Sequence, residues 1–125
     1  MIIKESGEDY LEAILVIKKA KGLVRSIDVA SELNVSKPSV SVAMKHFREE
    51  GYVVVDENGY LELTEKGLKI AQNVYERHEI IAKFLMTLGV CEGTALEDSC
   101  KIEHVISNES FDKLKEFLNK QKATN

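Results

Sequence analysis

Apolar residues recur at helical spacing in six stretches of this 125-residue chain. In the third stretch, Val40, Met44 and Phe47 stand at i, i+4 and i+7, which places them on one face of a helix. The second stretch has four apolar residues that we expect to be buried, namely Ile27, Val29, Ala30 and Leu33. The predicted helices cover about residues 7–19, 26–33, 36–50, 65–88, 94–106 and 109–121.

Residues typical of helix ends lie at these boundaries. Ser26, Ser36 and Thr64 each precede an apolar-periodic stretch, so we expect them to be N-caps. Thr94 and Glu97 have the spacing of a capping box, which predicts another helix start. The other end signals are Pro38 in the first turn of the third helix and the C-terminal glycines Gly51 and Gly89.

A β-hairpin is predicted directly after the third helix. Two runs of β-branched, aromatic and leucine residues, 52–55 and 60–63, flank a four-residue turn that ends in Asn58-Gly59. A tight hairpin after two closely spaced helices is typical of a winged helix-turn-helix. The predicted fold class is therefore mostly α with a small β-hairpin wing, followed by a second, helical module.

Composition sets the broad class of protein. No apolar run approaches the roughly 20 residues needed to span a bilayer, and the N-terminus lacks a signal-peptide pattern. Two cysteines do not make a disulfide framework and fit a reducing compartment. We therefore expect a cytoplasmic protein with no membrane partner.

The net charge of −4 does not favour nucleic-acid binding, but its distribution weakens that objection. Between Ser36 and Arg48 the chain has three cationic residues and no carboxylate, a local charge of +3. Phosphate contacts depend on such local clusters of positive charge.

The third helix carries the candidate DNA-binding residues. Residues near the start of such a helix reach base edges in the major groove, and flanking donors contact phosphates. The alternative interpretation is an ordinary capped helix that faces solvent. The candidates for base or phosphate contact are Ser36, Lys37, Pro38, Ser39 and Ser41, with Lys45 and Arg48 as contacts to the DNA backbone.

A candidate metal site lies near the other end of the chain. On a helix, Cys100, Glu103 and His104 stand at i, i+3 and i+4, so a thiol, a carboxylate and an imidazole share one face. Such a mixed set of donors suits a divalent transition metal. Further upstream, the candidates are His78 in the long fourth helix and the pair Asp9 and Glu12 in the first helix.

Each of these ligand candidates has a simpler interpretation. Ser6 and Asp9 fit a capping box, which would leave Asp9 a helix cap. Glu12 alone is most often a solvated charge, and a lone His78 is more often a surface or satisfied core residue. Cys100 alone is typical of a small buried hydrophobe.

Four motifs in order resemble one known family. They are Glu8-Asp-Tyr-Leu-Glu12, Ser36-Lys-Pro-Ser-Val-Ser41, Arg77-His-Glu79 and Cys100-Lys-Ile-Glu-His104. Together they are similar to the diphtheria toxin repressor and manganese transport regulator family of metal-dependent winged-helix repressors, from about residue 4 to residue 118.

The resemblance implies a homodimer that binds a near-palindromic double-stranded operator. It implies a DNA-binding domain over residues 1–70 and a helical metal-binding and dimerisation domain over residues 71–125. The family's metal-ligand positions fall on Asp9, Glu12, His78, Cys100, Glu103 and His104.

The chain departs from the family pattern at several positions. Asp9 is usual in the manganese regulators, whereas Cys100 is usual in the iron regulators. Ala82 and Leu96 stand where iron-type members have additional ligands, and Val42 replaces a polar residue common in the recognition helix. We expect Fe²⁺ or Mn²⁺ as the activating ion, with Co²⁺, Ni²⁺ or Zn²⁺ able to bind in vitro.

The predicted function is a metal-activated transcriptional repressor of genes for metal uptake or homeostasis. One alternative is a metal-independent winged-helix regulator whose histidines and cysteines are structural. Another is a small metalloenzyme, but the sequence has no nucleophile elbow, phosphate loop or His-Glu-x-x-His pattern, so we expect no catalysis.

Overall fold

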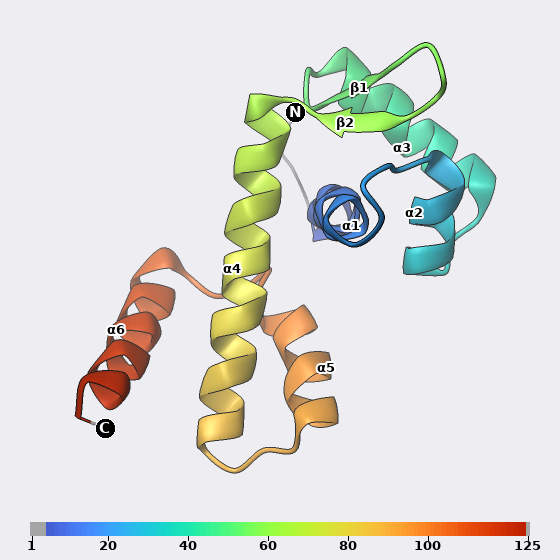
Figure 1. Cartoon of the computed structure of the whole chain (residues 1–125). Coiled ribbons are helices and arrows are strands. Elements are labelled where there is room, and N and C mark those ends of the chain that lie inside the picture. Colours follow the sequence, from blue (N-terminus) through green and yellow to red (C-terminus); the bar gives the residue numbers. More distant parts are fainter. Residues whose placement is uncertain (1–4, 125) are drawn as a thin grey trace. The chain divides into compact units, whose positions relative to one another are not determined.

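The computed structural model describes residues 5–124, and the element order matches the predicted mostly helical fold with one two-stranded hairpin (Figure 1). The chain divides into two compact units, one ending at Asn73 and one beginning at Val74. The elements are α1 (Glu5–Lys21), α2 (Ser26–Leu33), α3 (Lys37–Glu49), β1 (Val53–Val55), β2 (Leu61–Leu63), α4 (Glu65–Thr87), α5 (Glu92–Ile102) and α6 (Asn108–Thr124).

In the N-terminal unit, α2, a short turn and α3 form a helix-turn-helix. Asn34 ends α2 in the left-handed conformation, with a φ of 55°. The Ser36 hydroxyl then accepts the backbone N–H of Ser39 at 3.2 Å, which confirms Ser36 as the N-cap of α3. The predicted apolar face of α3 is also confirmed, because its three members are buried: Val40, Met44 and Phe47.

The hairpin pairs β1 and β2 antiparallel, with Val53 opposite Leu63 and Val55 opposite Leu61. The Asp56 carboxylate accepts the backbone N–H groups of Asn58 and Tyr60, which closes the predicted turn. Each strand is three residues long, one shorter than the apolar runs suggested.

Two tight contacts attach the hairpin to the start of α4. The Thr64 hydroxyl accepts the backbone N–H of Gly67 at 3.1 Å and donates to the carbonyl of Gly51 at 2.7 Å, so Thr64 caps α4 as predicted. A side chain at Gly67 would collide with the carbonyl of Tyr52, so this position requires glycine.

In the C-terminal unit, α5 and α6 lie on either side of the second half of α4 (Figure 1). Gly89, with a φ of 104°, ends α4 as predicted. The buried apolar residues of this unit are Val74, Ile81, Ala82, Ala95, Phe111 and Leu118. Among the described residues, no helix is long and apolar enough to cross a membrane.

Two expectations about α2 are wrong. The N-cap is Arg25, and Ser26 is already helical. The Asp28 carboxylate accepts the backbone N–H of Arg25 at 2.9 Å and so satisfies this helix end without a serine cap. The expected burial of the apolar residues is wrong at Ile27, which is 51% exposed, and at Leu33, which is only half-buried.

The expected capping box at Thr94 is also wrong. The preceding helix ends at Thr87, and Cys91 is already the N-cap of α5, so Thr94 lies inside the helix. This helix ends at Ile102 instead of Ile106, because the carbonyls of Glu103 and Ile106 accept hydrogen bonds from a side chain of α4.

Candidate functional site

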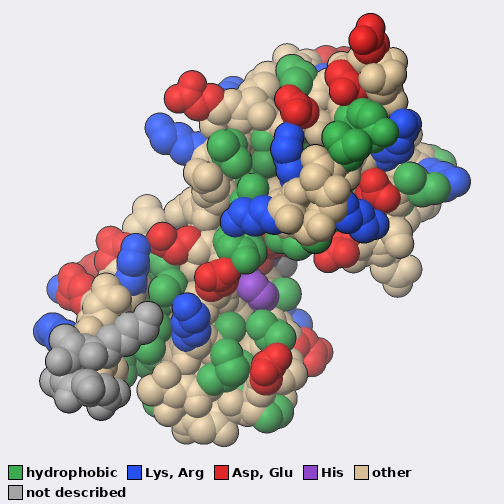
Figure 2. All heavy atoms as spheres, in the orientation of Figure 1, with side chains coloured by type: hydrophobic (Ala, Val, Ile, Leu, Met, Phe, Trp, Pro, Cys, Tyr) green, Lys and Arg blue, Asp and Glu red, His purple; other side chains and the backbone are tan. Residues whose placement is uncertain are grey.

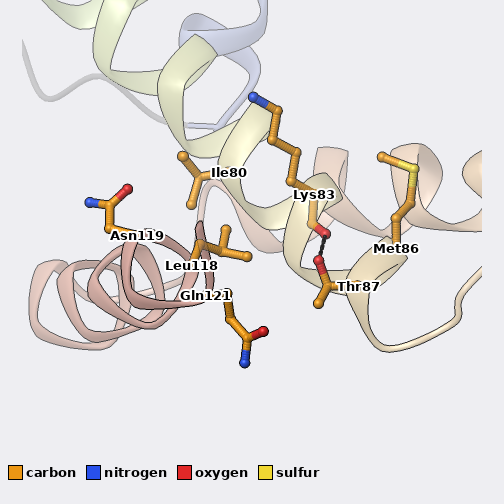
Figure 3. Close-up of a pocket in the computed structure, with 7 residues that line it drawn as sticks. All are labelled: Ile80, Lys83, Met86, Thr87, Leu118, Asn119 and Gln121. Atoms are coloured by element: carbon orange, nitrogen blue, oxygen red, sulfur yellow. Dashed lines mark hydrogen bonds between the residues drawn. The ribbon is translucent and has the colours of Figure 1, made fainter. Parts of the chain in front are cut away.

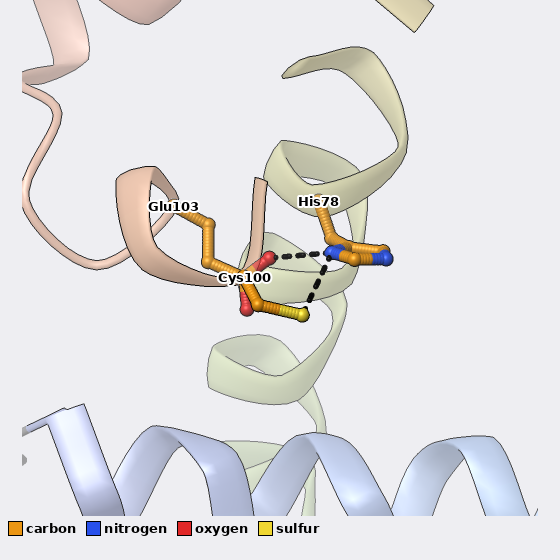
Figure 4. A group of neighbouring side chains, drawn as sticks. All are labelled: His78, Cys100 and Glu103. Carbon is orange, nitrogen blue, oxygen red and sulfur yellow. Dashed lines mark hydrogen bonds and ion pairs between the residues drawn. The ribbon is translucent and has the colours of Figure 1, made fainter. Parts of the chain in front are cut away.

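The C-terminal unit brings together three of the predicted metal ligands (Figure 4). His78 comes from the middle of α4, Cys100 from the last turn of α5, and Glu103 is the C-cap residue directly after α5. One donor atom from each of these side chains lies within 4.8 Å of the other two.

The individual distances suit a small cation. The Nδ1 atom of His78 is 2.9 Å from Oε2 of Glu103 and 3.8 Å from the Sγ atom of Cys100. His104 follows directly, with its Nε2 atom 3.4 Å from Oε1 of Glu103. Donors bound at about 2.0–2.3 Å to one ion lie roughly 3–4 Å apart, so these side chains are close to a ligand arrangement.

The Glu103 carboxylate is the most unusual group of the site. Its side chain is only 1% exposed, and its Oε1 atom has no hydrogen-bond partner among the residues that the structure describes. A buried carboxylate is costly unless a cation or hydrogen bonds compensate it. With imidazole and thiol donors beside it, this carboxylate fits a bound divalent ion.

The remaining two predicted ligands lie in the N-terminal unit. Asp9 and Glu12 are half-buried and one turn apart on α1. Because α1 already includes Glu5, Ser6 lies inside the helix, and the capping-box interpretation of Ser6 and Asp9 is wrong. The interpretation of Cys100 as a buried hydrophobe is also wrong, since Cys100 is exposed.

Sequence analysis missed two side chains that donate hydrogen bonds to the backbone of predicted ligands. The guanidinium of Arg77 donates to the carbonyl of Glu103, and the hydroxyl of Ser99 donates to the carbonyl of His78. Each lies next to a predicted ligand in sequence. Their partners are 26 and 21 residues away, so no local pattern reveals these contacts.

Two other features of this unit lie apart from the ligand cluster. Cys91 is exposed, and its hydrogen bond with the Thr94 hydroxyl is the largest of the causes that lower the pKa of Cys91. A groove of about 310 Å³ lies between α4 and α6 (Figure 3). The groove is lined by Ile80, Lys83, Met86, Thr87, Leu118, Asn119 and Gln121, none of which is a carboxylate, imidazole or thiol ligand.

The candidate DNA-binding residues all lie on the exposed surface at or along α3. Ser36 and Ser39 join their hydroxyls at 2.8 Å at the start of the helix. Val42, in the middle of the helix, is 59% exposed and presents an apolar surface there. The predicted contact residues are exposed in every case: Ser36, Lys37, Pro38, Ser39, Ser41, Lys45 and Arg48.

Acidic and basic side chains are interspersed on the face shown in Figure 2. This mixed pattern agrees with the small net charge of −4. Such a distribution limits the nonspecific component of DNA binding, which depends on neutralised phosphates.

Two protein-family models match nearly the whole chain. Residues 3–63 match the iron dependent repressor N-terminal DNA binding domain. Residues 64–124 match the iron dependent repressor metal binding and dimerisation domain.

Individual relatives agree with these matches. An uncharacterized HTH-type transcriptional regulator of Methanocaldococcus jannaschii is 37% identical over 122 residues, covering 96% of this chain and 98% of the relative. The HTH-type transcriptional regulator MntR of Geobacillus kaustophilus is 34% identical over 113 residues, covering 90% of this chain and 80% of the relative.

Solved structures show the same fold. The manganese regulator SloR matches with a TM-score of 0.79 at 30% identity, covering 95% of this chain and 55% of the SloR chain. The chain therefore spans about half the length of that solved regulator.

Proposed function

This chain belongs to the iron-dependent repressor family, and from this membership we propose which of its units binds DNA and which binds metal. The chain is a metal-dependent, DNA-binding transcriptional repressor of metal homeostasis, as the resemblance of its four sequence motifs predicted. We propose that residues 1–70 bind DNA and that residues 71–125 bind metal and form the homodimer. We further propose a cytoplasmic regulator without catalytic activity, in keeping with relatives that are transcriptional regulators.

We propose that one or more divalent ions, Fe²⁺ or Mn²⁺ in the cell, bind to six side chains. The observation that carries this proposal is the buried Glu103 carboxylate beside two imidazoles and a thiol. A bound ion supplies the positive charge that a buried carboxylate and a thiolate require. The proposed ligands are Asp9, Glu12, His78, Cys100, Glu103 and His104.

Control of DNA binding follows from where these ligands lie in the chain. Asp9 and Glu12 belong to α1 of the DNA-binding unit, whereas the other four belong to the C-terminal unit. When both sets bind one ion, they tie α1 to the dimerisation unit and restrict its arrangement. A ligand shifts a conformational equilibrium by its differential affinity for the two states. Metal therefore favours the arrangement in which α3 meets DNA.

The proposed DNA contacts use the exposed start of α3. We propose that Pro38 and the serine hydroxyls contact bases or phosphates and that the cationic Lys45 and Arg48 contact the DNA backbone, which their exposure on α3 supports. A two-fold dimer would present two such helices to successive major grooves, which predicts a near-palindromic operator.

Removal of metal is expected to weaken operator binding by about 1–3 kcal/mol, or roughly 5–150-fold, which is the usual range of allosteric coupling. A duplex selected from a random DNA pool in the presence of Mn²⁺ would be titrated with the full chain, with and without chelator. The rival metal-independent regulator predicts equal affinity in both samples, and that result would refute the proposed function.

Dimerisation is expected to use apolar side chains of the C-terminal unit. Leu96, Val105 and Phe117 are 38%, 77% and 44% exposed, so a dimer interface in this unit has large apolar side chains to cover. We therefore expect the full chain with Mn²⁺ to sediment as a dimer at micromolar concentration. A monomer under these conditions would contradict the prediction, and Val105→Glu is expected to shift the equilibrium toward monomer.

A further inference from the structure

Two side chains connect α4 and the end of α5 in opposite directions. Ser99 on α5 donates from its hydroxyl to the carbonyl of His78 on α4, at 2.6 Å. Arg77 on α4 donates from Nη1 to the carbonyl of Glu103, at 3.3 Å. Each hydrogen bond therefore ends on the backbone of a proposed metal ligand that belongs to the other element.

The hydrogen bond from Ser99 is additional to those that α4 itself requires. His78 lies inside α4, where a helical carbonyl is already the acceptor of the N–H four residues later. Ser99 is fully buried and stands four residues before Glu103 and one before Cys100. Its hydroxyl thereby fixes the position of two ligands on α5 relative to His78.

The Arg77 side chain holds the segment after α5. It is 9% exposed, and its Nη1 atom also donates to the carbonyl of Ile106, at 2.6 Å. The Nη2 atom donates to the side-chain oxygen of Asn108, the first residue of α6. An arginine fork can donate to several acceptors at once in a fixed geometry, which a lysine cannot reproduce.

We propose that Arg77 and Ser99 are positioning residues for metal binding, which fix the backbones of Glu103 and His78 before the ion arrives. This inference rests on the proposed function and adds two residues that do not themselves bind the ion. Groups that orient metal ligands from outside the ligand set typically contribute 10–100-fold to metal affinity. Here the orienting contacts act on the main chain of the proposed ligands and leave their side-chain donor atoms to the ion.

Ser99→Ala is the first test, because alanine fits the same space and α4 keeps its own hydrogen bonds. Co²⁺ affinity of the full chain would be measured anaerobically by competition with a chelator, together with the thiolate-to-Co²⁺ absorption band from Cys100. We expect the metal-free variant to unfold near the wild-type midpoint, its affinity to fall by about tenfold, and its band to weaken. The matched control is Thr87→Ala, which removes a hydroxyl that donates to the carbonyl of Lys83 on the same helix. The control is expected to keep wild-type affinity.

Arg77→Met and Arg77→Lys test the second contact. We expect the methionine variant to lose about 10–100-fold in Co²⁺ affinity and the lysine variant to lie between it and the wild type. Lys115→Ala is the control, since it removes an exposed ion pair with Glu76 between α4 and α6 and is expected to leave affinity unchanged. If the methionine variant does not fold, Asn108→Ala removes one acceptor of the fork and takes its place, with a several-fold loss expected.

The outcomes separate this inference from the proposed function. Folded Ser99→Ala and Arg77→Lys proteins with affinities and spectra within about twofold of the wild type would overturn the positioning role. A wild-type chain that binds no Co²⁺ would instead overturn the proposed metal site itself.

Discussion

Glu103→Gln is expected to remove the stabilisation that metal gives to the protein while leaving the metal-free protein at least as stable. The amide keeps the shape of the side chain but cannot supply a negative ligand to a divalent ion. In the metal-free state, the substitution removes a carboxylate that is 1% exposed and has an oxygen without a hydrogen-bond partner among the described residues. The glutamine amide can donate or accept a hydrogen bond, so it keeps the contact with Nδ1 of His78 while it removes the buried negative charge, and we expect no loss of stability.

The size of the effect follows from mass action. At a Mn²⁺ concentration of 100 times its Kd, the wild-type protein gains about 2.7 kcal/mol in the free energy of unfolding. If the substitution lowers affinity by about 100-fold, the variant gains only about 0.4 kcal/mol at the same concentration. Denaturant unfolding with and without Mn²⁺ measures both quantities.

Glu76→Gln is the matched control, because Glu76 is an exposed carboxylate of the same unit, paired with Lys115. The control is expected to show the same Mn²⁺-dependent increase in the free energy of unfolding as the wild-type protein. A Glu103→Gln variant that gains as much stability from Mn²⁺ as the wild type would show that Glu103 is not a ligand.

Local signals in the sequence predicted the elements that depend on local chemistry. Ser36 and Thr64 cap α3 and α4 as expected, because a hydroxyl three residues before a free N–H is sufficient to form each cap. Gly51 and Gly89 end helices for an equally local reason, since each has a positive φ. These features need no knowledge of the rest of the fold.

Elements that depend on distant residues were predicted less well. The spacing of Thr94 and Glu97 is common in helices and does not itself mark a helix start, so the true start near Cys91 was missed. The end of α5 was placed too late because Arg77, which lies on α4, takes the carbonyls of Glu103 and Ile106. No pattern within residues 94–106 encodes that contact.

The candidate metal site has some features that local spacing predicts and others that depend on distant contacts. Spacing on a helix suggested that Cys100 and Glu103 share a face, and the structure brings their donor atoms close to His78. The sequence gives no hint that Glu103 is buried or that Ser99 reaches His78, because both depend on how α5 packs on α4. Tertiary packing therefore decides which of the candidate ligands is buried.

Cys100→Glu is expected to shift activation toward Mn²⁺. A thiolate is a softer ligand than a carboxylate, and Mn²⁺ favours hard oxygen donors. We expect the unmodified protein to be activated by Fe²⁺ at a lower free concentration than by Mn²⁺, and Cys100→Glu to reverse this order. The proposed ligand Asp9 favours Mn²⁺, but we expect its effect to be smaller than that of Cys100, whose Sγ atom lies 3.8 Å from Nδ1 of His78 in the ligand cluster.

The measurement is operator binding as a function of free Mn²⁺ and Fe²⁺ under anaerobic conditions. A change of about tenfold in the ratio of the two activating concentrations corresponds to about 1.4 kcal/mol and is easily resolved. Cys100→Ser is the matched variant, because it removes the soft donor without adding a carboxylate and is expected to weaken both metals. Cys91→Ser controls for thiol chemistry elsewhere, since Cys91 is exposed and lies at the opposite end of α5. Activation of the unmodified protein by less Mn²⁺ than Fe²⁺ would overturn the assignment of Fe²⁺, because it would mean that the oxygen donors outweigh the single thiolate.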